Sequence, residues 1–140
     1  MHIYTVIYDN LDYLELQKKT LDKFIKHDFT FHVIDNTKNQ TYKLKKICNS
    51  LGIVHLQYSK AFYNKILFNN PSMDHSLALN SIVKKIDFNE INMCIDSDIF
   101  LIKEFSFNKI KNYSFCGVKQ TRNRLIFKKK YFWPGFIYNQ

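Results

Sequence analysis

The chain has few of the residues that usually interrupt or cross-link small folds: three glycines, two prolines and three cysteines in 140 residues. Cys48, Cys94 and Cys116 are odd in number, widely spaced and set among apolar residues, which argues against a disulfide framework or a zinc site. We expect buried free thiols in a reducing compartment. Without a Pro- or Gly-rich linker or an internal repeat, the length indicates a single domain, residues 1–140.

Long apolar runs are also missing. No stretch of about 18 apolar residues occurs, as a transmembrane helix would require. The sequence starts with the strand-like Met1-His2-Ile3-Tyr4 and not with a basic leader. We therefore expect no transmembrane segment and a cytoplasmic location.

Acidic residues are missing from the last quarter of the chain. All 12 Asp and Glu lie at or before Glu104, and the formal net charge is +9. Such a basic segment favours an anionic neighbour, which could be a phosphorylated ligand, a nucleic acid or a membrane surface. The alternative is a solvated face in a chain rich in Lys, Asn and Ile because its genome is AT-rich. The basic residues of segment 105–140 are Lys109, Lys111, Lys119, Arg122, Arg124, Lys128, Lys129 and Lys130.

Two carboxylates interrupt the apolar stretch of residues 91–102. Asp96 and Asp98 are costly to place there unless a cation meets them. On an extended chain, side chains two residues apart share a face, so Asp96 and Asp98 would point one way and Ser97 the other. Oxygen ligands suit a hard cation, and the pattern predicts a Mn²⁺ or Mg²⁺ site. The alternative is a turn between two strands, in which the carboxylates bind their own backbone.

Apolar periodicity predicts alternating strands and helices, and hence right-handed crossovers. The expected fold class is α/β and Rossmann-like, with a mainly parallel central sheet and helices on both faces. Segment 58–71 is predicted to be a loop because Asn69-Asn70-Pro71 interrupts it. Strands are expected at 2–8, 29–35, 53–57 and 91–95, and helices at 11–26, 42–51 (ended by Gly52) and 72–87 (capped by Ser72 or Asp74).

Polar residues follow three of the predicted strands. Ligands of open α/β sheets bind beyond the carboxyl ends of the strands. Tyr8-Asp9-Asn10, Asp35-Asn36 and Asp96-Ser97-Asp98 should therefore meet at one edge of the sheet and form a binding site. Asp9 and Asn10 have an alternative role as a helix-capping turn, and Asp35 has a similar alternative.

These strand ends, together with the helix that contains Ser76–Ile82, resemble nucleotide-sugar glycosyltransferases of the GT-A fold, in particular family-2-like enzymes with a D-x-D motif. Many of these enzymes carry an Ala-Arg-Asn-x-Gly-Ile signature on the helix before the D-x-D strand. Ala78, Asn80 and Ile82 match it, whereas Leu79 and Ser81 depart from it. The resemblance covers most of residues 2–104. It implies a GT-A sandwich with a donor-binding half at 1–104 and the start of an acceptor-side half at 105–140.

The resemblance also implies a ligand set. The donor would be a UDP- or GDP-sugar, and the acceptor a glycan, protein or lipid. Asp35 would bind the base or ribose, and Asp96 and Asp98 would hold Mn²⁺ or Mg²⁺ on the diphosphate. The expected donor-binding residues are Tyr8, Asn10, Asp35, Asn36, Asp74, Asn80 and Ser97.

Segment 131–139 resembles the aromatic, glycine-containing strand on the acceptor side of such enzymes. Trp133 could stack on a sugar face, and Gly135 would allow a ligand to approach closely. Trp133, Pro134 and Gly135 are therefore the expected acceptor-side residues. The alternative is an ordinary hydrophobic strand that Pro134-Gly135 turns.

A general base for the acceptor hydroxyl is not evident. In the enzymes that the chain resembles, an Asp or Glu well after the D-x-D usually serves, and none follows Glu104. Of the five histidines, all of which precede Asp96, His75 beside Asp74 is the one that we keep as a site candidate. The chain would then be the donor-binding part of a longer enzyme, a retaining enzyme or a degenerate relative.

Two other functions are alternatives to sugar transfer, which we favour over both. A non-catalytic nucleic-acid binder would use the basic residues 109–130, with Tyr131, Phe132 and Trp133 as stacking platforms. A D-x-D metal-dependent phosphatase or nuclease would need either Asp-x-Asp-Gly-Thr at an early strand or a Glu after the first strand. Neither pattern is present.

Overall fold

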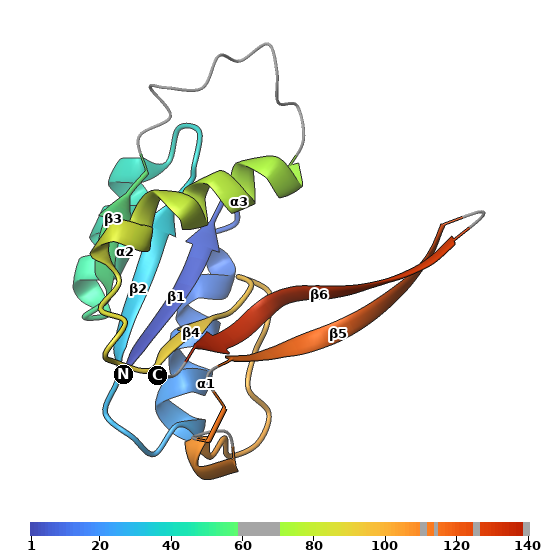
Figure 1. Cartoon of the computed structure of the whole chain (residues 1–140). Coiled ribbons are helices and arrows are strands. Elements are labelled where there is room, and N and C mark those ends of the chain that lie inside the picture. The colour runs from blue at the N-terminus through green and yellow to red at the C-terminus, as the bar shows by residue number, and fades with distance from the viewer. Residues whose placement is uncertain (59–70, 110–111, 114, 125–126, 139–140) are drawn as a thin grey trace.

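The computed structural model describes residues 1–58, 71–109, 112–113, 115–124 and 127–138. The predicted loop at 58–71 therefore lies almost wholly outside the described residues. In the part of the chain that is described, one six-stranded sheet has helices on both faces (Figure 1). No helix in these ranges is both long enough and apolar enough to cross a membrane.

Every strand and helix predicted up to Ile95 is present, although most are a residue or two shorter than expected. The third helix ends earlier than predicted, because the chain tightens into a 3₁₀ turn after Ile82 and leaves Val83 exposed. The elements are β1 (His2–Ile7), α1 (Asp12–Phe24), β2 (Thr30–Asp35), α2 (Thr41–Ser50), β3 (Val54–Gln57), α3 (Pro71–Ile82), η2 (Val83–Lys85), β4 (Asn92–Cys94), η3 (Phe107–Lys109), β5 (Phe115–Arg124) and β6 (Phe127–Tyr138).

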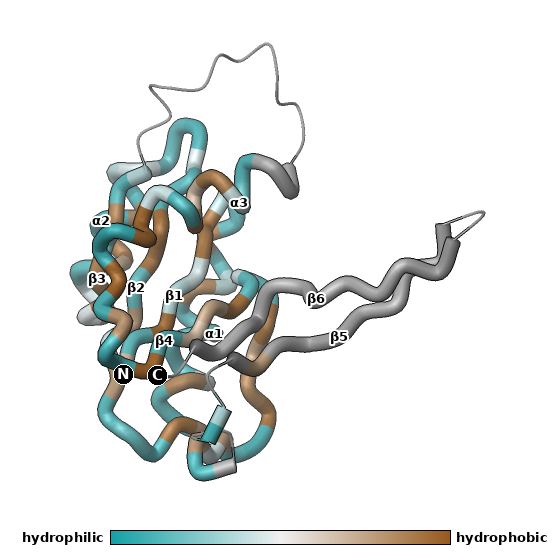
Figure 2. Tube along the Cα trace, viewed as in Figure 1, coloured by the Kyte–Doolittle hydropathy of each residue, from teal (hydrophilic) through white to brown (hydrophobic). Residues whose placement is uncertain are grey.

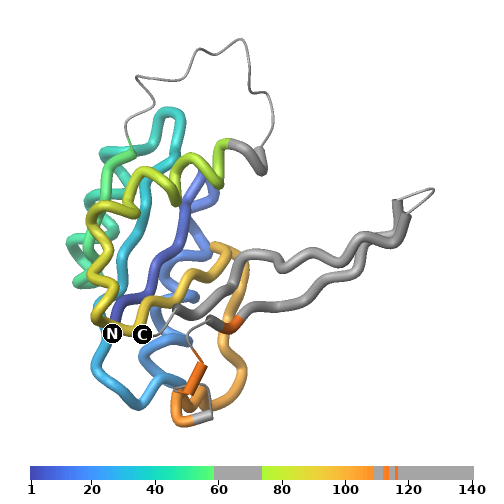
Figure 3. Tube along the Cα trace, in the orientation of Figure 1, coloured from blue at the N-terminus to red at the C-terminus, as the bar shows by residue number. Residues whose placement is uncertain are grey.

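The strand order is β3-β2-β1-β4-β6-β5. The first four strands in this order are parallel to one another, whereas β6 runs antiparallel to β4 and β5 antiparallel to β6. Figure 3 shows β1, in blue, between β2 and the yellow segment that contains β4. The prediction of a mainly parallel, Rossmann-like α/β sheet is confirmed.

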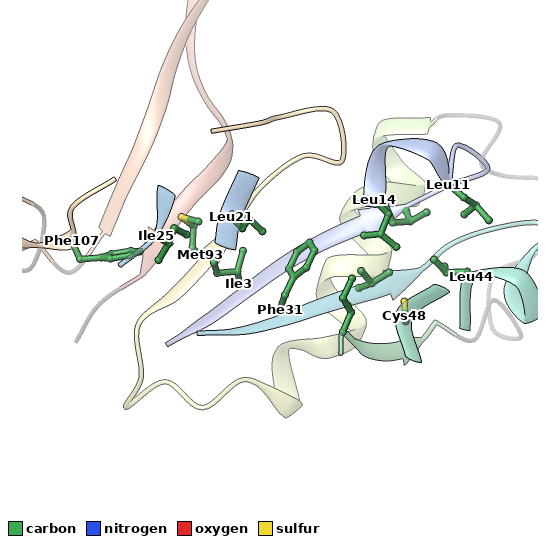
Figure 4. Packing of buried hydrophobic residues seen from close by; sticks show 13 residues of the cluster. Ile3, Leu11, Leu14, Leu21, Ile25, Phe31, Leu44, Cys48, Met93 and Phe107 are labelled. Carbon is green, nitrogen blue, oxygen red and sulfur yellow. The ribbon is translucent and has the colours of Figure 1, made fainter. Parts of the chain in front are cut away.

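Alternation along the strands divides the core into two layers. On one face, Ile3 and Ile7 of β1 pack with Leu14 and Leu21 of α1 and with Leu44 of α2 (Figure 4). Figure 2 shows hydrophobic residues along β1 and β2, between the helices. The first layer therefore joins both α1 and α2 to the sheet.

The second layer joins α3 to the opposite face. Tyr4 and Val6 alternate with the residues of the first layer, and they pack with Ala78 and Ile82 of α3. Both layers are buried, and the prediction of helices on both faces of the sheet is confirmed.

The predicted end of α2 at Gly52 is also confirmed. Gly52 has a φ of +64°, which glycine adopts at little cost. The N–H of Ile53 donates to the carbonyl of Cys48 at 2.9 Å, and the N–H of Gly52 donates to the carbonyl of Asn49 at 3.5 Å. These two hydrogen bonds form a Schellman motif, which turns the chain from α2 into β3.

The predicted cap of α3 is wrong, and the alternative cap of α1 is not found in the described residues. The residue that precedes α1 is Leu11, without a capping side chain, while the carboxylate of Asp9 accepts the backbone N–H of Lys38 at 3.1 Å. Because α3 begins at Pro71, Ser72 and Asp74 lie inside its first turn. Proline is suited to a first helical position, where its missing N–H has no partner to lose.

Cys48 and Cys94 are buried free thiols, as predicted, and Cys116 is free and partly buried. Burial, with the nearby charge of Asp35, raises the pKa of Cys48 to about 11. Burial and the nearby charge of Asp96 raise the pKa of Cys94 to about 12. Both thiols therefore stay protonated and serve as packing groups.

β6 and β5 add an antiparallel pair of strands to one side of the parallel sheet. Ile137 of β6 lies opposite Met93 of β4. The pairing of β5 with β6 shifts register between Cys116 and Val118, opposite the segment that contains Pro134 and Gly135. A strand with an irregularity at Pro134-Gly135 matches the sequence alternative. The side chains of Trp133 and Pro134 lie outside the described part of the chain, so their acceptor-side role stays a prediction.

Candidate functional site

The order in which strands are added to the sheet reverses between β1 and β4. Helix α1 connects β1 to β2 across one face, and α3 precedes β4 on the other. In such sheets, ligands bind beyond the carboxyl ends of the strands at the point where the strand order reverses. The loops at this point begin at Tyr8 after β1 and at Ile95 after β4.

The D-x-D residues lie in a turn and not on an extended strand. The N–H of Ile99 donates to the carbonyl of Asp96 at 3.1 Å, which places Ser97 and Asp98 at the two central positions. The expectation that Asp96 and Asp98 share one face of a strand is therefore wrong, because the backbone turns directly after β4. The Asp96 side chain is 25% exposed, and Asp98 is exposed.

Gln17 of α1 holds this turn from one side of the sheet. Its Nε2 donates to the carbonyls of Asp96 at 2.8 Å and of Ile99 at 3.1 Å. Sequence reasoning missed Gln17. The available signal was a polar residue three positions after Leu14 and four before Leu21, on the apolar stripe of an amphipathic helix.

His75 of α3 reaches the same turn from the other side. Its Nε2 lies 3.7 Å from Oδ1 of Asp96, and its ring stacks on Tyr8 with centroids 6.2 Å apart and planes inclined by 22°. Burial lowers the pKa of His75, and Asp96 only partly opposes this. The imidazole is therefore neutral near pH 7, and its contact with Asp96 is not a charged pair at that pH.

Tyr8 is at the centre of this group. Burial raises its pKa to about 12; a hydrogen bond with the side chain of Asn36 lowers the pKa, and the charges of Asp74 and Asp96 raise it further, as does Tyr58. The Tyr8 hydroxyl is therefore neutral. The structure brings together Tyr8, Asn36, Asp74 and Asp96 of the predicted site, and adds Tyr58, which sequence reasoning did not select.

Asp35 lies at the end of β2, as predicted, and is 3% exposed. Its Oδ1 accepts the backbone N–H of Thr37 at 2.9 Å and the Thr37 hydroxyl at 2.8 Å, and its Oδ2 lies 3.0 Å from Nε2 of His55. Burial alone would raise the pKa of Asp35, but these hydrogen bonds outweigh it and lower the pKa. Asp35 is thus an ionised, oriented acceptor, and its contact with a nucleoside stays a prediction.

The remaining predicted donor-binding residues differ in position. Asn10 is exposed in the loop after β1, and Ser97 is partly buried in the turn. Asn80 is exposed on α3, while its neighbours in the signature, Ala78 and Ile82, are buried against the sheet. Packing at an interval of four residues therefore accounts for two of the three signature matches.

The sequence predicts that the carboxylates of Asp96 and Asp98 bind a divalent cation. Among the described residues, no group of three or more His, Cys, Asp or Glu side chains is arranged to hold a metal ion. Mg²⁺ is usually bound by one or two carboxylates, with substrate phosphates and water completing its coordination. The binding of Mn²⁺ or Mg²⁺ by Asp96 and Asp98 stays a prediction.

No protein-family model matches the chain, and no curated protein matches it in sequence. Among solved structures, residues 1–349 of S. aureus TarS, a glycosyltransferase, match with a TM-score of 0.56 and 16% identity, over 99% of this chain and 46% of that one. This likeness shows a shared Rossmann-like α/β fold. A second TarS structure matches with a TM-score of 0.48 and 19% identity, over 74% of this chain and 17% of that one. The chain thus spans less than half of the length of either structure.

Proposed function

We propose that the chain is the donor-binding part of a glycosyltransferase that moves a sugar from a UDP- or GDP-sugar to an acceptor hydroxyl. The observation that carries the proposal is the meeting of the Asp96 turn, Tyr8 and His75 where the strand order of a parallel sheet reverses. The glycosyltransferase-like fold supports it. The division into a donor-binding half at 1–104 and an acceptor-side half from 105 belongs to the same proposal.

Each residue of the site has a proposed role. Asp96 and Asp98 would hold Mn²⁺ or Mg²⁺, which would neutralise charge on the departing nucleoside diphosphate. The neutral hydroxyl of Tyr8, beside Asn36, would donate a hydrogen bond to the donor nucleotide. Asp35, oriented by Thr37 and His55, would accept an N–H of the base or a ribose hydroxyl.

Asp96→Asn tests the proposal because it removes one charge while keeping the size of the side chain. Wild-type protein is screened against UDP- and GDP-sugars with MnCl₂ by thermal shift, since a ligand at 100 times its Kd adds about 2.7 kcal/mol to stability. We expect calorimetric affinity for the best ligand to fall at least about tenfold in Asp96→Asn, equivalent to about 1.4 kcal/mol. Asp22→Asn, which alters an exposed carboxylate of α1, is the control and should leave the affinity unchanged.

Two results would contradict this function. One is the absence of binding of every UDP- and GDP-sugar, with and without Mn²⁺. The other is binding that Asp96→Asn leaves intact. Steeply salt-dependent binding of single-stranded oligonucleotide, equal in wild type and Asp96→Asn, would favour the nucleic-acid-binding alternative.

A further inference from the structure

We propose that Gln17 is a positioning residue for the carboxylates of Asp96 and Asp98, and that its amide sets the affinity of the site for a metal–nucleotide complex. The inference rests on the proposed function. It concerns a side chain on α1 that touches the backbone of the turn and not the carboxylates themselves.

The turn determines the orientation of the Gln17 amide. Nε2 donates both of its hydrogens, to the carbonyl of Asp96 at 2.8 Å and to that of Ile99 at 3.1 Å. A flipped amide would place its oxygen against two carbonyl oxygens. The carbonyl of Asp96 also accepts the N–H of Ile99 at 3.1 Å, so Gln17 and the turn's own hydrogen bond share one acceptor. One side chain therefore holds both ends of the turn.

A buried glutamine at position 17 costs stability that an apolar side chain would not cost. The side chain is 0% exposed and lies on the apolar stripe between Leu14 and Leu21. Its Oε1 is buried and has no hydrogen-bond partner among the described residues. A buried acceptor without a partner is destabilising, and an apolar side chain would avoid that penalty. Holding the turn explains why an amide occupies this position.

The two helical layers meet at this turn. Gln17, from the α1 layer, holds the backbone at Asp96, while His75, from the α3 layer, lies against the carboxylate of the same residue. β4 ends only two residues earlier, and the N–H of Ile95 still donates to the carbonyl of Tyr4 at 2.9 Å. The direction of the carboxylates therefore depends on how the turn is held beyond that last hydrogen bond to β1.

Asn92 offers a matched control at the other end of β4. It is 3% exposed, and its Nδ2 donates to the carbonyls of Asp87 at 2.8 Å and Glu90 at 2.7 Å. Its Oδ1 is also buried, with no hydrogen-bond partner in the described part of the chain. Asn92 thus has the same chemistry as Gln17, but it holds the loop before β4 and not the turn after it.

The experiment compares Gln17→Met with Asn92→Leu in the full chain. Each variant replaces a buried amide by an apolar side chain of similar length, and both should lower the urea midpoint. Calorimetry uses MnCl₂ with UDP or GDP, whichever wild type binds more tightly, under conditions where all proteins are folded. It should show at least a tenfold loss of affinity in Gln17→Met. Asn92→Leu should stay within twofold of wild type. Gln17→Asn, which keeps the amide but is one methylene too short to reach both carbonyls, should resemble Gln17→Met.

Equal affinities in the Gln17 variants and wild type would overturn the proposal, as would equal losses in Gln17→Met and Asn92→Leu. Loss of folding in both Gln17 variants would make Gln17 a requirement of the core and would also overturn it. If wild type binds neither UDP nor GDP, with or without MnCl₂, the proposed function fails. Hydrogen exchange of the Ile99 N–H then tests whether Gln17 holds the turn. Exchange that is tenfold faster in Gln17→Met, with unchanged exchange of the β1 amides, supports this role, and equal exchange of the Ile99 N–H refutes it.

Discussion

Two histidines meet where β1 and β2 begin. Nδ1 of His2 lies 3.0 Å from Nε2 of His32, and the His32 ring stacks on Tyr4 with centroids 4.6 Å apart. Burial, with a smaller effect of His2, lowers the pKa of His32 from 6.5 to about 4. Asp87 acts electrostatically on Tyr4 beside them. Protonation of His32 is therefore disfavoured in the folded protein.

Stability should accordingly fall in mild acid. Between pH 6.5 and about 4, His32 binds a proton in the unfolded chain but not in the folded one. The free energy of unfolding is therefore highest above pH 6.5 and decreases by up to about 1.4 kcal/mol per pH unit as the pH falls through this window. In urea denaturation near pH 7 and pH 5, His32→Phe should show a smaller pH dependence than wild type. His27→Gln, at an exposed histidine, should match wild type; an unchanged pH dependence in His32→Phe would disprove the assignment.

Among the elements, α2 shows how a local signal ends a helix. Gly52 lies just beyond the helix with a φ of +64°, and a Cβ added there would meet nothing within 4 Å. The reason for glycine is therefore backbone conformation and not crowding. The hydrogen bonds of Gly52 and Ile53 to the last turn depend on that conformation.

Gly52→Ala should destabilise the protein by about 1–2 kcal/mol, the cost of a left-handed conformation for an L-residue with a Cβ. Gly52→Asn should cost less, because asparagine tolerates this conformation better. Urea denaturation followed by circular dichroism measures both. Lys46→Ala, at an exposed position within α2, is the control and should lie close to wild type. A stability of Gly52→Ala equal to wild type would show that the cap does not limit stability.

At the scale of the whole molecule, the strands β1 and β2 contribute side chains to both helical layers. Ile3 and Phe31 face α1 and α2, while Val6 and Ile34 belong to the layer of α3. Loss of either layer therefore exposes one face of the same strands. The layers should unfold together, and the site between them should be lost in the same transition.

Leu14→Ala tests this cooperativity. Leu14 is 0% exposed and Leu16, on the same helix, is 47% exposed. We expect Leu14→Ala to lose about 2–5 kcal/mol through the cavity that it leaves, and Leu16→Ala to lose much less. Circular dichroism and hydrogen exchange of amides in α3 should report one transition. Unfolding of α1 while α3 stays protected would show that the layers are independent.

Much of the fold could be predicted from the sequence, because its signals are local. Runs rich in β-branched and aromatic residues predicted β1 and β2, a period near 3.6 predicted α1 and α2, and Gly52 predicted where α2 ends. The sequence also indicated that Tyr8, Asp35 and Asp96 follow strands that end at one edge of the sheet. Helix starts were predicted less well, because Leu11 precedes α1 without a capping side chain and α3 begins at Pro71, before the expected caps Ser72 and Asp74.

What the sequence determined by itself is the type and order of the elements and the carboxyl edge to which the acidic residues belong. Only the tertiary structure decided how those residues are held: the turn at Asp96, its amide clamp from Gln17, the contact of His75 and the partnership of Asp35 with His55. The physical reason is sequence distance. Gln17 and Asp96 are 79 residues apart, and a hydrogen bond between such residues leaves no periodic pattern along the chain.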